Sequence, residues 1–217
     1  MFMKLFSYWR SSASYRVRIA LNVKGIEYDY VPVHLVKDGG EQHSEQYQEM
    51  NPARLVPTLV DENEGLTLNQ SMAIVEYLDE AYPDTEQLVY GDKKSRALIR
   101  TIAYDVGCDI QPIANLRILN YLTDNLNMEA DKKTQWAQHW IRTGFEALEK
   151  RLVKSSGKYC IGDKLSLADV CLVPQAYNAT RFGVDLADYP TIQRVVDNCN
   201  QLQAFIDAKP ENQPDAG

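Results

Sequence analysis

A short apolar run at the start of the chain leads through a cluster of hydroxyl residues into an amphipathic stretch. Residues 3–8 indicate a β-strand, and residues 14–24 carry apolar side chains at helical spacing. The cluster between the two contains Ser11, Ser12 and Ser14. Serine hydroxyls cap helix starts, and the positive end of a helix attracts anions. The pattern predicts a strand–turn–helix unit whose turn is either a plain helix cap, with Ser14 as the cap, or a site for a thiolate, carboxylate or phosphate.

Strand and helix signals alternate in the first part of the chain. The further segments are a strand over residues 28–33, a hairpin over 57–61 and 66–68, and a helix over 71–82 capped by Ser71. This order favours a mixed sheet with helices packed on it. We therefore expect an α/β, thioredoxin-like domain over residues 1–83, followed by a linker over residues 84–91.

The second part of the chain shows helix signals and no strand signals. The expected elements are a long helix over residues 93–125 kinked at Pro112, a helix over 130–152, a capping box at residues 166–169, a last helix from Pro190, and a disordered polar tail from Pro210. An all-α domain over residues 92–217 is predicted.

Composition excludes several classes of function. The net charge of −7 argues against a nucleic-acid partner, which usually requires a basic face. No run of about 18 apolar residues suggests a membrane span, and no secretory signal is visible, so we expect a cytoplasmic protein.

The cysteines limit the redox chemistry of the chain. They form no C-x-x-C pair and have no histidine cluster beside them, so we expect no metal site and four buried, reduced thiols. Residues 1–107 contain no cysteine. A thioredoxin-like domain there cannot use its own dithiol, and a reactive sulfur would have to come from a ligand.

The stretch Arg10–Leu21, RSSASYRVRIAL, is similar to the signature of the zeta-class glutathione transferases. Ala13 stands where that family usually has a cysteine. Four further motifs follow in the family's order, namely Val56-Pro57-Thr58-Leu59, Asn69-Gln70-Ser71, Gln111-Pro112 with Asn115-Leu116, and Pro174-Gln175 through Arg181-Phe182. The resemblance covers nearly the whole chain and implies the two-domain architecture of cytosolic glutathione transferases, together with a homodimer.

The resemblance also implies roles for individual residues. Ser11 would face the thiol of glutathione with Ser12 beside it, and the backbone of Val56, before a cis bond to Pro57, would pair with glutathione. The other implied contacts are Gln70 and Ser71 to the γ-glutamyl group, Gln42 to the glycyl end, Gln111 and Asn115 to the cleft, and Arg181, with Arg10 as a second candidate, to a substrate carboxylate. Plain alternatives stand beside these roles: a helix cap for Ser71, interhelical hydrogen bonds for the two carboxamides, and a solvated Arg181.

A helix start can activate a thiol without a general base. A free thiol has a pKa of about 8.5, and lowering it to about 6.5 requires about 2.7 kcal/mol. The helix N-terminus contributes about 0.3–1 kcal/mol, and a hydrogen bond to the charged form about 1.5–3 kcal/mol. The two effects together suffice, and the Ser11–Ser12 turn could offer both.

The implied reaction is the glutathione-dependent cis–trans isomerisation of maleylacetoacetate to fumarylacetoacetate, a step of phenylalanine and tyrosine catabolism. Thiolate adds to the double bond, rotation follows, and elimination returns glutathione. The alternatives are isomerisation of maleylpyruvate, a conjugating or dehalogenating transferase, and a glutathione-binding protein without catalysis. A thiol–disulfide oxidoreductase is disfavoured because residues 1–107 lack cysteine.

Overall fold

The structure is a computed structural model that describes residues 3–216, and the chain is built in two units. The first unit contains the residues up to Leu88 together with those from Gln201 onward, and the second runs from Val89 to Asn200. The division falls inside the segment 84–91. The C-terminal segment, which the sequence analysis assigned to the helical domain over 92–217, packs instead with the first unit.

A four-stranded sheet in the order β2-β1-β3-β4 forms the centre of the first unit. Its strands are β1 (Met3–Ser7), β2 (Asp29–Pro32), β3 (Thr58–Asp61) and β4 (Leu66–Asn69). β2 runs parallel to β1, while β3 pairs antiparallel with both β1 and β4. Parallel neighbours need a crossover, and helix α1 (Ser12–Lys24) supplies it. The predicted thioredoxin-like arrangement is confirmed.

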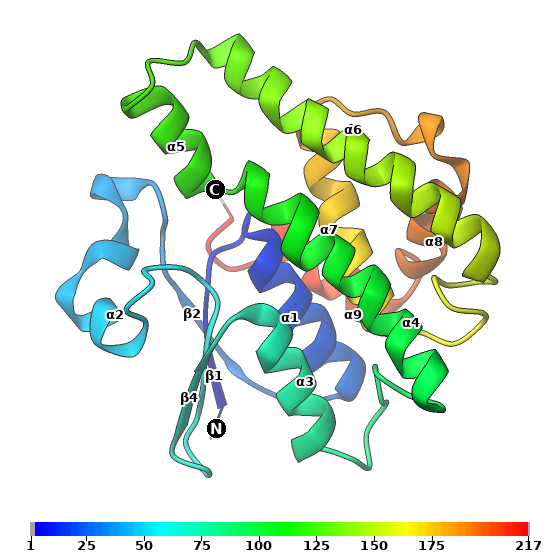
Figure 1. The fold of residues 1–217 in the computed structure, drawn as a ribbon. Helices are drawn as coiled ribbons and strands as arrows, with labels where there is room; N and C mark the ends of the chain where they lie inside the picture. Colours follow the sequence, from blue (N-terminus) through cyan, green and yellow to red (C-terminus); the bar gives the residue numbers. More distant parts are fainter. Residues whose placement is uncertain (1–2, 217) are drawn as a thin grey trace. The chain divides into compact units, whose positions relative to one another are not determined.

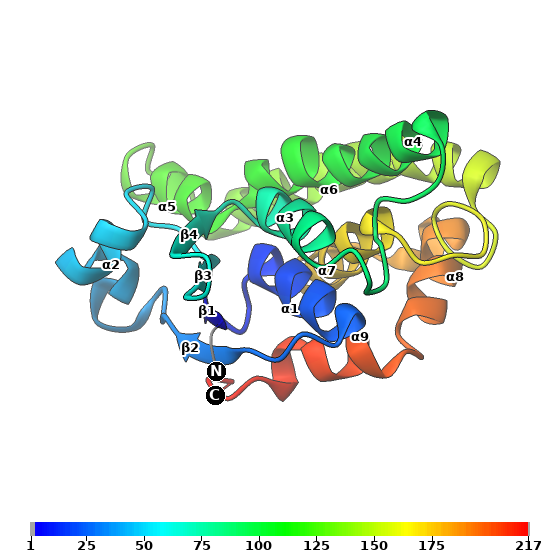
Figure 2. The same ribbon diagram turned by 90° about the horizontal axis from the view of Figure 1, so that it is seen from below.

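Helix α1 is the central helix of this unit. It packs against α3 (Ser71–Ala81) and, as Figure 2 shows, against the C-terminal helix α9 (Gln203–Ala208). Its apolar positions, including Val17, Ile19 and Leu21, are fully buried. Helix α2 (Glu45–Met50) lies in the polar loop between β2 and β3. The blue α1 and teal α3 lie next to each other in Figure 1.

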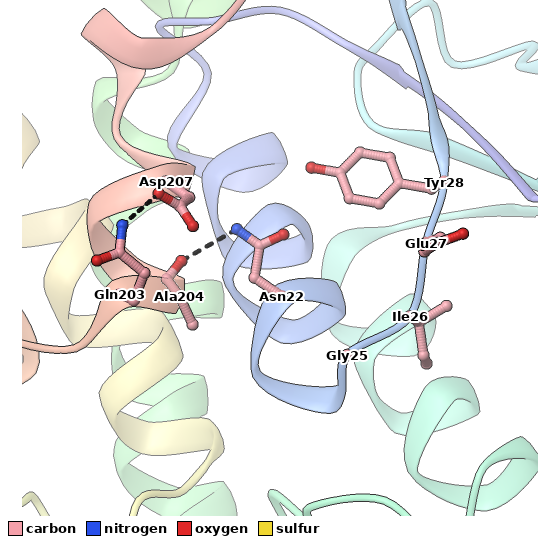
Figure 3. A pocket seen from close by; sticks show the side chains of 8 residues that line it. All are labelled: Asn22, Gly25, Ile26, Glu27, Tyr28, Gln203, Ala204 and Asp207. Atoms are coloured by element: carbon pink, nitrogen blue, oxygen red, sulfur yellow. Dashed lines mark hydrogen bonds between the residues drawn. The ribbon is translucent and has the colours of Figure 1, made fainter.

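The tail from Pro210 to Ala216 is ordered, which corrects the sequence-based expectation. The last predicted helix is two helices, α8 (Pro190–Cys199) and α9, and a 3₁₀ turn at Pro210–Asn212 follows them. A polar side chain of α1 binds α9, because Asn22 Nδ2 donates to the Ala204 carbonyl at 3.0 Å (Figure 3). Such bonds link residues too distant in sequence for a local pattern to reveal.

The second unit is helical, as predicted, but its first long helix is broken. Helix α4 (Lys93–Tyr104) continues into a π-helical turn (Asp105–Ile110) and a 3₁₀ turn (Gln111–Ala114) before α5 (Leu116–Asp124) begins. The expected kink at Pro112 is therefore a full break three residues later, at Asn115, where the backbone is extended with φ −69° and ψ 149°. Proline lacks the N–H that would continue the helix, and Pro112 lies in the first positions of the 3₁₀ turn that begins at Gln111.

Two long helices, α6 (Ala130–Ser155) and α7 (Leu167–Arg181), follow in the second unit, and α8 is its last helix. Gly144 lets α6 approach the π-helical turn closely, because a Cβ there would lie 2.3 Å from Ile110 Cγ1. The capping box predicted at the start of α7 is confirmed. Asp169 is fully buried and accepts from the Ser166 N–H at 2.9 Å.

No helix within residues 3–216 is long and apolar enough to cross a membrane.

Candidate functional site

The turn between β1 and α1 places the hydroxyl groups differently from the simplest expectation. Ser11 is the N-cap, and its Oγ accepts from the Ser14 N–H at 3.2 Å. Ser14, predicted as the cap, lies inside the helix, and its buried hydroxyl has no hydrogen-bond partner among residues 3–216. The helix therefore begins two residues earlier than expected. The Ser11 N–H donates to the Tyr8 carbonyl at 3.0 Å and closes a turn, and the extended backbone of Ser11 ends this turn just before the helix.

The capping bond leaves the Ser11 hydroxyl able to donate a hydrogen bond of its own. A serine hydroxyl has two acceptor lone pairs and one proton, and the bond from Ser14 uses an acceptor. The proton of Ser11 stays available to an anion placed at the helix start. Ser11 and Ser12 are half-buried, and the helix dipole adds partial positive charge there.

Arg10 adds a full positive charge to the same turn. Its guanidinium lies 4.7 Å from the centre of the Trp9 ring and donates to the Tyr8 hydroxyl at 3.0 Å. The side chain is exposed, but two aromatic residues fix its direction.

The bond between Val56 and Pro57 is cis, as the family resemblance implied. It directly precedes β3, and Val56 is buried in a cluster that includes Tyr8 and Val33. No hydrogen bond between residues 3–216 uses the backbone N–H or carbonyl of Val56. Both groups can therefore pair with an extended ligand.

The start of α3 is an open helix end. Gln70, not Ser71, is its N-cap, and the Gln70 side chain makes no capping bond. Gln70 has φ +71° and ψ 109°, a conformation that L-residues avoid. Ser71, predicted as the cap, is the first helical residue, and its Oγ accepts from Arg16 Nη1 at 3.2 Å. The uncapped N–H groups and the buried Arg16 cation behind them favour a carboxylate.

Gln42 presents a buried acceptor in the loop before α2. Its Nε2 donates to the Leu35 carbonyl at 3.2 Å, while its Oε1 has no partner among the described residues. The side chain is 7% exposed. Unpaired buried acceptors are costly, so this oxygen fits a ligand that carries an N–H donor.

The sheet brings these loops of the first unit to one end. Phe6 of β1 lies opposite Thr58 of β3, and Thr58 lies opposite Asn69 of β4. The segments that leave these strand ends are the β1–α1 turn, the Val56–Pro57 step and the start of α3. One ligand with two carboxylates, two peptide groups and a thiol matches this set, and glutathione has that composition.

The candidate residues of the second unit do not form a shared helix face. Gln111 begins the 3₁₀ turn, whereas Asn115 is the N-cap of α5, with Oδ1 accepting from the Arg117 N–H at 3.1 Å. Gln111 and Asn115 are four residues apart and would share one face of the continuous helix predicted over residues 93–125, but the backbone extends at Asn115 and separates them. Arg181 lies at the exposed end of α7, where its guanidinium donates to Asn178 Oδ1 at 3.0 Å and lies 5.7 Å from the Phe182 ring centre.

Three of the four cysteines are buried, and the fourth, Cys108, lies on the turn that precedes Gln111. Cys160, Cys171 and Cys199 are buried as expected, but Cys108 on the π-helical turn is exposed. Burial raises the pKa of Cys160 and Cys199 further above the range of a reactive thiol. Among residues 3–216, no group of three or more His, Cys, Asp or Glu side chains could hold a metal ion. The pocket in Figure 3, between the end of α1 and α9, contains none of the predicted site residues.

Sequence reasoning missed two buried arginines of α1. Arg16 is 2% exposed and holds Ser71, and Arg18 is 0% exposed and contacts the β1–α1 turn. A signal for both was present, since two charges interrupt the otherwise apolar run from Tyr15 to Leu21. Charged residues in such a run are expected to be buried and paired.

Comparisons with known proteins agree with this geometry. Family models described as "Glutathione S-transferase, N-terminal domain" and "Glutathione S-transferase, C-terminal domain" match residues 5–86 and 116–203. A Vibrio cholerae protein named probable maleylacetoacetate isomerase is 50% identical over 98% of this chain and 97% of its own.

Two solved structures are similar over 99% of this chain. The holo structure of a bacterial zeta-class maleylpyruvate isomerase is covered over 100% of its length, with 44% identity and a TM-score of 0.93. The maleylacetoacetate isomerase of Methylobacterium extorquens AM1, solved with bound malonate and glutathione, is covered over 99%, with 36% identity and a TM-score of 0.94.

The strained backbone of Gln70 gives a first prediction. At a position with ordinary backbone angles, a protein with glycine is less stable toward unfolding than the same protein with alanine by about 0.5–1 kcal/mol. Here the order should reverse, because removing the Cβ relieves strain of about 1–3 kcal/mol. We expect the Gln70→Gly variant to be more stable than Gln70→Ala by about 1 kcal/mol in urea denaturation. The pair Gln87→Gly and Gln87→Ala is the control for composition, and the ordinary order at both positions would contradict the strain.

Proposed function

Because this chain belongs to the zeta class of the glutathione S-transferase family, we propose that it catalyses the glutathione-dependent isomerisation of maleylacetoacetate to fumarylacetoacetate. We further propose that it acts as a cytoplasmic homodimer in the breakdown of phenylalanine and tyrosine. One observation carries the proposal: the Ser11 turn, the free backbone of Val56 and the open start of α3 leave the same end of one sheet.

Each part of glutathione has a counterpart in the first unit. The γ-glutamyl carboxylate fits the start of α3, with Gln70 and Ser71 at its side and Arg16 behind. The cysteinyl backbone fits the unpaired N–H and carbonyl of Val56. The unpartnered Oε1 of Gln42 fits an N–H near the glycyl end. These three contacts would direct the thiol toward the turn between β1 and α1.

The chain itself contributes charge stabilisation and no sulfur. Bound glutathione would supply a thiolate that adds to the double bond of the substrate, allows rotation, and leaves again. The Ser11 hydroxyl would donate a hydrogen bond to this sulfur, and the dipole at the start of α1 would add partial positive charge. Ser12 lies beside both. Ala13 occupies the position where the family usually has a cysteine, so the activation rests on hydroxyl groups.

The first test of this mechanism is the Ser11→Ala variant. We expect kcat to fall about 100-fold while KM for glutathione changes less than about threefold, because the lost hydrogen bond acts on the charged sulfur. Initial-rate kinetics at saturating keto acid measure both values.

Ser44→Ala is the matched control for the loss of a helix cap. Ser44 caps α2 through a 3.3 Å bond to the Tyr47 N–H, so both variants should lose about 1 kcal/mol of stability. Only Ser11→Ala should lose turnover. An unchanged kcat in Ser11→Ala would remove this hydroxyl from the mechanism.

The reaction class is tested by limiting glutathione. With keto acid in large excess over glutathione, an isomerase forms many molecules of trans product for each glutathione and returns the thiol intact. A conjugating transferase stops when glutathione is consumed as a thioether. Product analysis by NMR separates these cases, and glutathione binding without either product would overturn the proposed activity.

Maleylpyruvate is the second candidate substrate, because the similar maleylpyruvate isomerase covers 99% of this chain at 44% identity. It is a shorter keto acid with the same cis double bond. A competition assay with both substrates gives the ratio of their kcat/KM values and identifies the preferred one.

We propose that Arg181 binds a substrate carboxylate, with Arg10 in support and Gln111 and Asn115 near the bound ligands. A charge-assisted bond contributes about 1.5 kcal/mol or more, so Arg181→Met should raise KM for the keto acid about tenfold and leave KM for glutathione unchanged. Arg142→Met is the control, since Arg142 is also an exposed arginine of the second unit. Equal KM values in the two variants would contradict the role of Arg181.

A further inference from the structure

The peptide groups of Trp9, two residues before Ser11, are held from outside the turn. The Trp9 N–H donates to Asp215 Oδ2 at 3.1 Å, and the Trp9 carbonyl accepts from Arg18 Nη2 at 3.1 Å. Asp215 belongs to the C-terminal segment and Arg18 to α1. The C-terminal segment and α1 therefore fix the two peptide groups that flank the Cα atom of Trp9.

The Arg18 side of this arrangement is buried and fully engaged. Besides Trp9, the guanidinium donates to Ser7 Oγ, to the Tyr8 carbonyl and to the Ala208 carbonyl at 3.3, 3.4 and 3.1 Å. Burial lowers the pKa of Arg18, and the Asp215 carboxylate is among the groups that oppose this effect. Arg18 thus joins the turn to the end of α9.

The Asp215 side has a second donor. Tyr30, on β2, donates from its hydroxyl to Asp215 Oδ1 at 2.6 Å. Burial and the nearby carboxylate raise the pKa of Tyr30 far above its usual value, so the phenol stays a donor. Both oxygens of Asp215 are engaged, one by the sheet and one by the turn. The carboxylate is thereby oriented toward Trp9.

We propose that Asp215 is a positioning residue that, together with Arg18, fixes the Trp9 peptide and so sets the place of the Ser11 hydroxyl. The proposal rests on the function assigned to Ser11 above. Ser11 ends the turn that starts at Tyr8, because its N–H donates to the Tyr8 carbonyl. A rotation of the Trp9 peptide would move the hydroxyl, and a displacement of about 1 Å can lower a rate about 100-fold.

Asp215→Ala, Asp215→Asn and Asp207→Ala test this role. Asp207 is the matched control, because it is an exposed carboxylate in the same segment and accepts from Gln203 within α9 (Figure 3). Amide hydrogen exchange of Trp9, followed by NMR in the ligand-free protein, reports the clamp without any turnover. The ultraviolet absorbance of bound glutathione against pH reports thiolate formation, and steady-state kinetics give kcat and KM.

In Asp215→Ala we expect Trp9 exchange to accelerate about tenfold or more, and kcat to fall about 10- to 100-fold. KM for glutathione should change less than about twofold, and thiolate should form at higher pH. Asp215→Asn keeps one acceptor oxygen and should give a smaller change in each quantity. Asp207→Ala should match the original protein throughout.

Two results would overturn the positioning role. One is unchanged Trp9 exchange in Asp215→Ala. The other is a lower melting temperature with unchanged kcat and unchanged thiolate formation, which would make Asp215 an anchor of the tail alone. Failure of the proposed function looks different: the original protein then shows no isomerisation, or Ser11→Ala does not alter thiolate formation, while Trp9 exchange in Asp215→Ala still reports on the clamp.

Discussion

The buried guanidinium of Arg18 is the interaction on which the first unit depends. Removing a charge from water costs several kcal/mol unless hydrogen bonds and an opposite charge compensate. Arg18 meets this requirement with carbonyl and hydroxyl groups of β1, the following turn and the C-terminal segment, and with the nearby Asp215. These segments must come together for the charge to be tolerated. An apolar residue at this position would pack without specifying where the turn and tail lie.

A second buried charge stabilises the other end of α1. Lys24 Nζ lies 2.8 Å from Asp79 Oδ1 of α3 and donates to the Glu86 carbonyl at 2.9 Å. Asp79 also accepts from the Leu88 N–H. Together with the bond from Arg16 to Ser71, this pair fixes α3 against α1 at both ends. The start of α3 is therefore held by side chains of α1, and no side-chain cap occupies it.

Local patterns predicted the elements, and non-local contacts decided their details. The strand–turn–helix unit, the hairpin and the capping box at Ser166 each depend on residues close in sequence, and each was found as expected. The choice of Ser11 over Ser14 as the cap, and the break at Asn115, depend on backbone angles that residue types alone do not distinguish. The docking of the tail rests on contacts such as Trp9 with Asp215, 206 residues apart, which no sequence pattern reports. The family resemblance named candidate site residues and its signature contains Arg18, but it assigned no role to Arg18 and did not include Asp215.

The docking of α9 has a consequence for the order in which the chain folds. Synthesis proceeds from the N-terminus, so the sheet and α1 emerge long before Gln201 and the residues after it. Until then, Arg18 lacks the carbonyl of Ala208 and the carboxylate of Asp215. All residues of the second unit, up to Asn200, are synthesised before the first unit receives its segment from Gln201 onward. The first unit to be made is thus the last to be finished, and the turn that carries Ser11 reaches its final form only after the segment that contains Ala208 and Asp215 has been synthesised.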